Sequence, residues 1–149
     1  MPRVKPLQAA LMATPDETEA QFYEALQHAD LDRVMSVWSD DEDIACIHPG
    51  GPRLVGAQAI RSAFESLFAN GSVDARISQV RRIVAGGFAV HHVLEELRVA
   101  TPEGPQRAYV LATNIFVKTP QGWRLLAHHA SPGTAQETPE ISEAPAVLH

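Results

Sequence analysis

The sequence predicts an α+β domain in which three helices cover one face of a strongly curved antiparallel sheet. Two observations lead to this prediction. Helical periodicity dominates the first half of the chain, whereas the second half alternates in the manner of strands separated by short turns. Helices segregated from a run of strands are typical of α+β domains, and sequential strands joined by short turns pair antiparallel.

Caps and apolar stripes predict the three helices. Thr14 caps the first helix, and Glu17 completes a capping box three residues later. Asp30 caps a second, short helix. A third helix begins near Gly56 and carries the clearest apolar stripe of the chain. That stripe consists of Ile60, Ala63, Phe64, Leu67 and Phe68.

Five strands are predicted from runs rich in valine, leucine and aromatic residues. Clusters of glycine and proline separate them, as turns require. A short strand precedes the third helix and four long ones follow it, over 44–48, 73–84, 88–100, 106–118 and 123–131. We therefore expect one domain over 14–133, a flexible N-terminal arm over 1–13 and a disordered tail over 134–149.

Composition excludes several classes of function. The 149 residues carry 18 acidic and 12 basic side chains, so the formal net charge of −6 argues against nucleic-acid binding. The single cysteine, Cys46, cannot form an internal disulfide and lies in an apolar run, which predicts a buried, inert thiol. No segment approaches the roughly 18 apolar residues of a membrane helix, and no signal peptide is evident. We expect a cytoplasmic protein that binds no membrane.

Several short motifs follow one another along the chain, at 30–34 with Trp38, at 47–51, at 54–56 and at 122–132. Together they resemble the SnoaL-like branch of the nuclear-transport-factor-like superfamily, which includes ketosteroid isomerase, and the resemblance covers 15–133. The resemblance implies a cone: a bent sheet around an apolar cavity, closed by the helices. It also implies a homodimer through the outer face of the sheet. Polyketide cyclases, dehydratases and kinase association domains share this fold, so the fold alone does not define the function.

Two pairs of adjacent histidines lie on predicted strands. Successive side chains of a strand face opposite ways, so one histidine of each pair, 91/92 and 128/129, can face the cavity. From the first pair we take His92 as a ligand-binding candidate. From the second pair, the resemblance implies that His129 and Ser131 share the cavity face, with Asn114 on the neighbouring strand.

The hypothesis for this group is acid–base chemistry. His129 is the candidate catalytic acid or base, because histidine titrates near neutral pH. Asn114 and Ser131 are candidates to orient a substrate carbonyl or carboxylate. In the alternative, His129 donates a hydrogen bond to Ser131 or to the backbone and has only a structural role.

Trp38 and His48 form a second candidate group at the mouth of the cone. As ligand-binding residues, both would line the entrance. In the alternative, Trp38 packs against the sheet, which is the commoner role of an indole, and His48 stabilises the turn that follows it.

Glu95 and Glu96 interrupt an apolar strand, and only one of them can point inward. If the inward carboxyl is buried without a partner, its pKa should rise and it could act as a base. The alternative is a surface carboxylate that pairs with an arginine on the sheet. The candidate arginines are Arg98, Arg107 and Arg124.

The remaining motifs are absent. The sequence has no HExxH or other close-spaced metal motif, no Gly-x-Ser-x-Gly elbow and no phosphate-binding loop, so we expect neither a metal nor a cofactor. The function predicted is a small-molecule-binding domain of unknown substrate. It would be a cofactor-free lyase or isomerase that uses His129 or the inward glutamate. The alternative is a non-catalytic dimeric ligand-binding or association domain. Expected partners are a second copy and a small apolar or acidic molecule.

Overall fold

The computed structural model describes residues 12–133 and 140–143 of the chain. Three helices and six strands make up these residues. The helices are α2 (Pro15–Gln27), α3 (Leu31–Ser36) and α4 (Ala57–Phe68). The strands are β1 (Ala45–Ile47), β2 (Arg53–Val55), β3 (Asp74–Ala85), β4 (Phe88–Thr101), β5 (Gly104–Thr119) and β6 (Gly122–Pro132).

The predicted helix starts are confirmed. The Thr14 side chain accepts a hydrogen bond from the backbone N–H of Glu17 at 3.1 Å, and Asp30 caps α3 in the same way. Both bonds satisfy an N–H that has no partner within the helix. Gly56 precedes α4 with φ of 92°, a conformation that glycine adopts without strain.

All six strands form one sheet, in the order β2-β1-β6-β5-β4-β3. The four long strands pair antiparallel, as predicted. The sheet as a whole is mixed, however, because β1 runs parallel to β6. The strand β2 was not among the predicted strands, since three residues are too few to show alternation.

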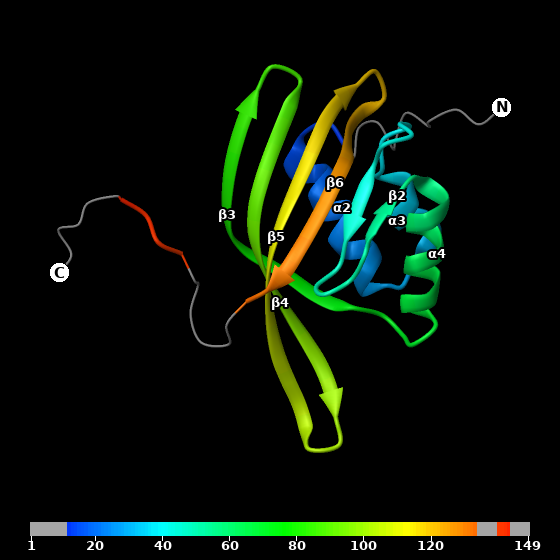
Figure 1. The fold of residues 1–149 in the computed structure, drawn as a ribbon, viewed down its shortest axis with the longest axis vertical. Helices are drawn as coiled ribbons and strands as arrows, with labels where there is room; N and C mark the ends of the chain where they lie inside the picture. The colour runs from blue at the N-terminus through cyan, green and yellow to red at the C-terminus, as the bar shows by residue number, and fades with distance from the viewer. Residues whose placement is uncertain (1–11, 134–139, 144–149) are drawn as a thin grey trace.

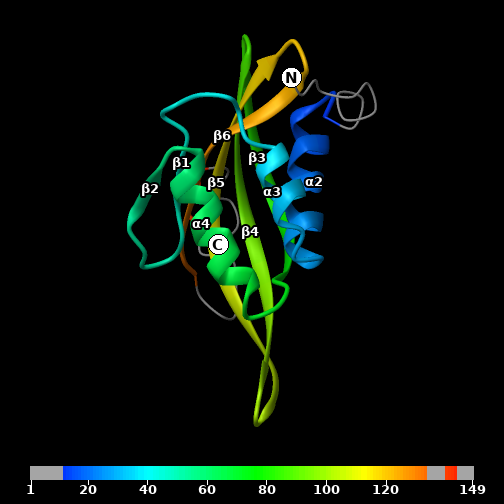
Figure 2. The same ribbon diagram turned by 90° about the vertical axis from the view of Figure 1, so that its right-hand side faces the viewer.

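The long strands bend away from a flat sheet, and the helices lie on one side of them, with α2 behind the strands in Figure 1. A β-bulge interrupts β3 between Ser78 and Arg81, where Gln79 has a φ of 52°. A second irregularity lies opposite Ile115 and Phe116. Bulges of this kind increase local twist and bending. The hairpin of β4 and β5 extends well beyond the rest of the sheet (Figures 1 and 2).

The core lies between the helices and the inner face of the sheet. Phe22 of α2 packs edge to face against Phe64 of α4, with ring centroids 6.1 Å apart. Burial of such side chains supplies most of the favourable free energy of folding. Trp38 also belongs to this core and is buried. Its indole N–H has no hydrogen-bond partner among the described residues.

The two ends of the chain lie mostly outside the described residues. Of the expected arm over 1–13, Met12 is seen to be buried, and its carbonyl accepts a hydrogen bond from Trp123 N–H. Of the expected tail, Glu140 forms an ion pair with Arg81. Among the described helices, none combines the length and apolarity that a membrane crossing needs.

Candidate functional site

A pocket of about 210 Å³ lies between the inner face of the sheet and helices α2 and α4. Its walls are mainly apolar, and exposed Pro49 and Leu67 belong to them. Three titratable side chains also line it: His48, Glu95 and His128. The full lining is Phe22, Leu26, His48, Pro49, Phe64, Leu67, Val73, Ala75, Glu95, Leu97, Val110, His128 and Ala130.

A hydrogen-bonded network supports the polar part of this pocket. Tyr23 of α2 donates its hydroxyl hydrogen to Oε2 of Glu95 at 2.6 Å. Asn114 of β5 donates from Nδ2 to the Tyr23 hydroxyl at 3.2 Å and to Oε2 of Glu19 at 2.9 Å. All four side chains are buried, and together they connect α2 to the centre of the sheet.

Glu95 is the carboxyl group that faces the pocket. It is 6% exposed, and burial raises its pKa to about 7. The hydrogen bond from Tyr23 stabilises the charged form and lowers the pKa, while repulsion by Glu19 raises it. A carboxyl group that titrates near neutral pH can both take and return a proton. Burial and the nearby Glu95 charge also raise the pKa of Tyr23, so its hydroxyl keeps its hydrogen.

His128 faces the pocket from β6. Its Nδ1 lies 2.6 Å from Oδ1 of Asn114, and its Nε2 lies 3.9 Å from Oε2 of Glu95. The ring is 5% exposed, and burial together with repulsion by His48 and His129 lowers its pKa to about 3. At neutral pH the imidazole is therefore uncharged.

His48 lies on the loop after β1 and contacts both His128 and Phe64, with ring centroids 6.3 and 5.2 Å away. Its Nε2 is 3.6 Å from the Cys46 sulfur. Burial lowers the pKa of His48 and raises that of Cys46 to about 12. The predicted burial of Cys46 is confirmed, and its high pKa leaves it a thiol at neutral pH.

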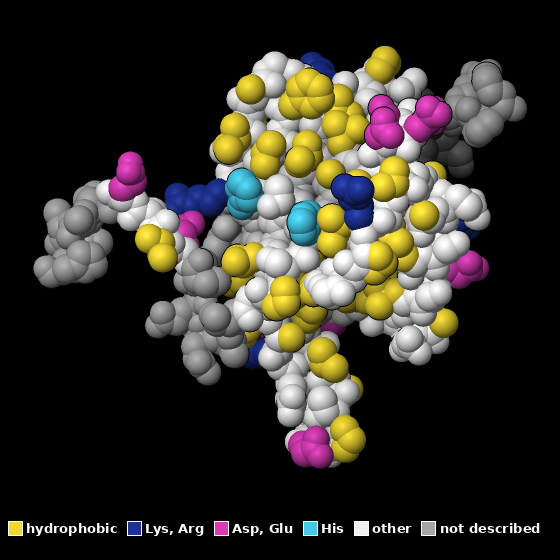
Figure 3. All heavy atoms as spheres, viewed as in Figure 1, with side chains coloured by type: hydrophobic (Ala, Val, Ile, Leu, Met, Phe, Trp, Pro, Cys, Tyr) yellow, Lys and Arg dark blue, Asp and Glu magenta, His cyan; other side chains and the backbone are white. Residues whose placement is uncertain are grey.

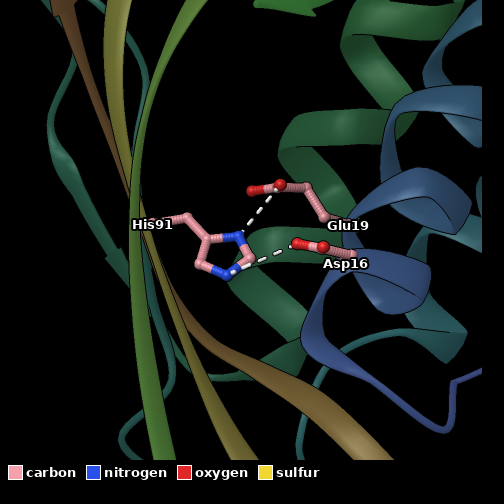
Figure 4. A group of neighbouring side chains, drawn as sticks. All are labelled: Asp16, Glu19 and His91. Atoms are coloured by element: carbon pink, nitrogen blue, oxygen red, sulfur yellow. Dashed lines mark hydrogen bonds and ion pairs between the residues drawn. The ribbon is translucent and has the colours of Figure 1, made fainter. Parts of the chain in front are cut away.

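A second group of side chains continues the same network along α2, with Glu19 and His91 buried and Asp16 exposed (Figure 4). His91 of β4 points at α2, where its Nδ1 lies 3.0 Å from Glu19 and its Nε2 lies 3.7 Å from Asp16. These residues offer three possible metal-ligand atoms within 4.8 Å of one another. Each carboxylate already has another donor, however: Arg82 for Asp16 and Asn114 for Glu19. The two ring nitrogens face different carboxylates, which suits a hydrogen-bonded support rather than a chelate.

The outer face of the sheet carries the other histidine of each pair. His92 and His129 are exposed and, with Ser131, line a shallow groove of about 450 Å³ beside Arg81 and Glu140. Our prediction that these side chains face the interior is therefore wrong. His129 and Ser131 do share a face, but the inward positions belong to His91 and His128.

The structure separates the remaining candidates. Asn114 is in the interior, as expected, and His48 lines the pocket. Trp38 packs in the core, which is the structural alternative for that residue. Glu95 points inward, whereas Glu96 points outward and pairs with Arg107 at 3.1 Å. Glu95 is thus the inward carboxyl group, although Tyr23 is its hydrogen-bond partner, and Glu96 is the surface carboxylate paired with an arginine.

Sequence reasoning missed Glu19 and Tyr23. A usable signal was present, because the apolar stripe of the first helix, extended back by one turn from Phe22, reaches Thr18 and Glu19. A glutamate at a stripe position is either a surface exception or a buried partner of another polar group. The structure shows the second case.

The comparisons with known proteins agree with this fold. The family model of the SnoaL-like domain matches residues 16–135, so the chain belongs to the SnoaL-like family. A search of the curated proteins found no match.

Solved structures extend the comparison. One from Thiobacillus denitrificans is named provisionally as a calcium/calmodulin-dependent protein kinase type II association domain. It has a TM-score of 0.75 and 34% identity, over 83% of this chain and 98% of that one. Another, from Streptomyces avermitilis, is named provisionally as a dehydratase of the NTF2-like family. Its TM-score is 0.74 with 26% identity, over 88% of this chain and 100% of that one. A protein with a cystatin-like fold from Caulobacter vibrioides has a TM-score of 0.69 and 16% identity, over 80% of this chain and 87% of that one, which shows the fold alone.

Proposed function

We propose that the protein is a cofactor-free lyase or isomerase that moves a proton on a small carbonyl compound held in the inner pocket. Glu95 is the group that takes and returns this proton. The proposal rests on one observation: the carboxyl group of Glu95 is buried in an apolar pocket and has a pKa of about 7. We expect the reaction to take place in the cytoplasm, on the sequence prediction.

The chemistry follows from this setting. The Glu95 carboxylate takes the hydrogen from the carbon beside a carbonyl, and the electron pair of the broken C–H bond moves into an enolate. In an isomerase the carboxylic acid then returns the proton to another carbon. In a lyase the enolate expels a β-hydroxyl group, which leaves as water with the Glu95 proton. The 26% identity to a protein named provisionally as a dehydratase supports the second form.

Tyr23 supports this role for Glu95. Its hydroxyl donates to one carboxyl oxygen at 2.6 Å and fixes the plane of the carboxyl group. A base that is held in one orientation loses less entropy in the transition state than a mobile one. His128 is not suited to the same task, because a pKa of about 3 makes its imidazole a weak base.

Deuterium exchange tests the proposal. In D₂O, the wild-type protein should catalyse exchange of the hydrogens beside the carbonyl of small cyclic ketones and enones, followed by NMR. Glu95→Gln keeps the acceptor for Tyr23 but cannot carry a proton, so exchange should fall by about 100-fold or more. Glu96→Gln is the matched control and should exchange at the wild-type rate. Equal rates for the wild type and Glu95→Gln would contradict the proposal.

A second candidate function is association through the outer face of the sheet. Hydrophobic side chains gather over the strands on this face (Figure 3). By strand register and alternation, Ile83 and Phe88 lie on the same face as His92, and they are 59% and 54% exposed. Such exposure is costly for large apolar groups in water. The 34% identity to a protein named provisionally as an association domain also favours this function. The expected partner is a second copy of the chain, and the two functions can coexist.

Sedimentation equilibrium tests the association. A homodimer should persist at micromolar concentration, and Phe88→Asp should give a monomer because it places a charge in the apolar face. Glu103→Gln, on the tip of the β4–β5 hairpin, is a control outside that face. A wild-type monomer at this concentration would contradict the association.

A further inference from the structure

The donors and acceptors of the hydrogen bonds behind the pocket can be assigned one after another, beginning at Glu19. Oε2 of Glu19 accepts a hydrogen bond from Nδ2 of Asn114 at 2.9 Å. Oε1 of Glu19 lies 3.0 Å from Nδ1 of His91. The Asn114 amide must therefore present its NH₂ group to Glu19.

This requirement fixes the amide of Asn114. The Nδ2 group of Asn114 has two hydrogens, one for Glu19 and one for the Tyr23 hydroxyl. The Tyr23 hydroxyl donates its own hydrogen to Glu95, so it is free to accept from Asn114. If the amide were turned by 180°, its oxygen would face the Glu19 carboxylate, and two acceptors would oppose each other in a buried site.

The fixed amide in turn selects the tautomer of His128. Its oxygen Oδ1 lies 2.6 Å from Nδ1 of His128, so Nδ1 carries the hydrogen and donates. A neutral imidazole has one hydrogen, and Nε2 is then a bare acceptor. Nε2 lies on the side of Glu95, at 3.9 Å from its Oε2, which is beyond hydrogen-bond distance.

The charges of the side chains that line the pocket also limit the charge of its ligand. None of the described residues that line it is a lysine or an arginine. The side chains that can contact a polar ligand atom there are the imidazoles of His48 and His128 and the carboxyl group of Glu95. Burial lowers the pKa of both imidazoles, which disfavours their cationic forms. An anionic ligand would lose its hydration without gaining a cationic partner.

We infer that the inner pocket selects an uncharged ligand whose hydroxyl group donates a hydrogen bond to Nε2 of His128, the tautomer of which is fixed by Glu19 and Asn114. This inference rests on the proposed function, since it takes the inner pocket as the ligand site. Of the small apolar and acidic ligands expected from the sequence, it selects neutral ones with a hydroxyl group. Glu19 and Asn114 are positioning residues that act through His128.

The tautomer can be measured directly. Long-range ¹H–¹⁵N correlation spectra of the ¹⁵N-labelled wild-type protein at neutral pH distinguish a protonated from a bare ring nitrogen. For His128 the expected result is a hydrogen on Nδ1 and none on Nε2. A hydrogen on Nε2 would overturn the inference.

Three bicyclic probes of similar shape test the ligand class by fluorescence titration. 2-Naphthol has a hydroxyl group, 2-methoxynaphthalene lacks its hydrogen, and 2-naphthoate is an anion. 2-Naphthol should bind roughly tenfold more tightly than the ether, which is the effect of one buried hydrogen bond. 2-Naphthoate should bind most weakly. Tighter binding of 2-naphthoate than of 2-naphthol, or no binding of 2-naphthol, would overturn the inference.

The variant His128→Asn isolates the Nε2 acceptor. The asparagine amide can still donate to Asn114 in place of Nδ1, so the support of the site is kept. The preference for 2-naphthol over the ether should shrink to about twofold or less. A preference as large as in the wild type would overturn the role of Nε2. His129→Asn, one residue away on the outer face, should leave the preference unchanged.

The outcomes separate this inference from the proposed function. Loss of exchange in Glu95→Gln together with a hydrogen on Nε2 of His128 would leave the proposed function standing and remove the ligand class. In the opposite outcome, His128 has the predicted tautomer and the three probes bind in the predicted order, but the wild type and Glu95→Gln exchange at equal rates. The pocket would then be a binding site for neutral ligands without catalysis.

Discussion

The two faces of the central strands carry the same residue types in opposite settings. His128 is buried and held by Asn114, whereas His129, the next residue, is exposed in the outer groove. Glu95 is buried beside Tyr23, whereas Glu96 pairs with an arginine at the surface. A shift of one position along a strand therefore converts a solvated side chain into one with a strongly shifted pKa.

This contrast shows that the properties of the site depend on the hydrogen-bond partners of its side chains more than on their residue types. Each inward polar group has a partner on another element: Tyr23 from α2 for Glu95, and Asn114 from β5 for His128. Buried polar groups without such partners would cost more free energy than the fold can spare. The outer groups, His129 and Glu96, lie at the surface, and their removal should cost little.

The largest expected effect is on the apolar wall of the inner side. Phe64 is fully buried between Phe22, His48 and Phe68, and it also lines the pocket. Phe64→Ala should lower the free energy of unfolding by about 3–5 kcal/mol, measured by urea denaturation. Leu67→Ala, one turn further along α4 and exposed, should cost less than about 1 kcal/mol.

The comparison between these two positions would fail if Phe64→Ala were nearly neutral. Such a result would mean that α4 does not pack its apolar stripe against the core. Helix α4 would then not form a wall of the inner pocket, and the inner side of the sheet would not differ from the outer side as a packed core.

The next effect is a pH dependence that only the inner glutamate should show. The folded-state pKa of Glu95 is about 7 against 4.5 for the ordinary group, so the folded protein binds this proton more tightly than the unfolded chain. The stabilisation is therefore complete below pH 4.5 and is lost as the pH rises through about 7. The two pKa values correspond to about 3 kcal/mol at most.

Urea denaturation at about pH 5 and about pH 8 measures this effect. The free energy of unfolding of the wild type, relative to that of Glu95→Gln, should decrease from the lower to the higher pH by up to about 3 kcal/mol. The free energy of unfolding of the wild type relative to that of Glu96→Gln should not change with pH in this way. A Glu95→Gln difference that is independent of pH would mean that the carboxyl group is hydrated in solution.

Much of the fold could be predicted from the sequence because local signals agree with it. The caps at Thr14 and Asp30, the stripe of the third helix and the glycine-rich turns all coincide with elements of the structure. The parallel pairing of β1 with β6 and the short strand β2 could not be predicted. Both are formed by tertiary contacts between distant segments, which leave no periodic signal in three residues.

The candidate site was predictable in composition but not in orientation. Alternation shows that adjacent histidines face opposite ways, but it does not show which one faces inward. That depends on the register of each strand, and irregularities at Ser78–Arg81 and at Ile115–Phe116 interrupt the register. The supporting helix residues, Glu19 and Tyr23, act through the tertiary fold, and only Glu19 was indicated in advance, by its position on the stripe one turn before Phe22.

The smallest expected effect tests whether the inner or the outer face of the sheet carries the reaction. His129 was the catalytic candidate from the sequence, and the structure places it in the outer groove, exposed. His129→Ala should change the free energy of unfolding by no more than about 0.5 kcal/mol, and the deuterium exchange rate by no more than about twofold. Sedimentation of the same variant should show whether it alters association on that face. Loss of exchange in His129→Ala, with exchange retained in Glu95→Gln, would move the active site to the outer groove.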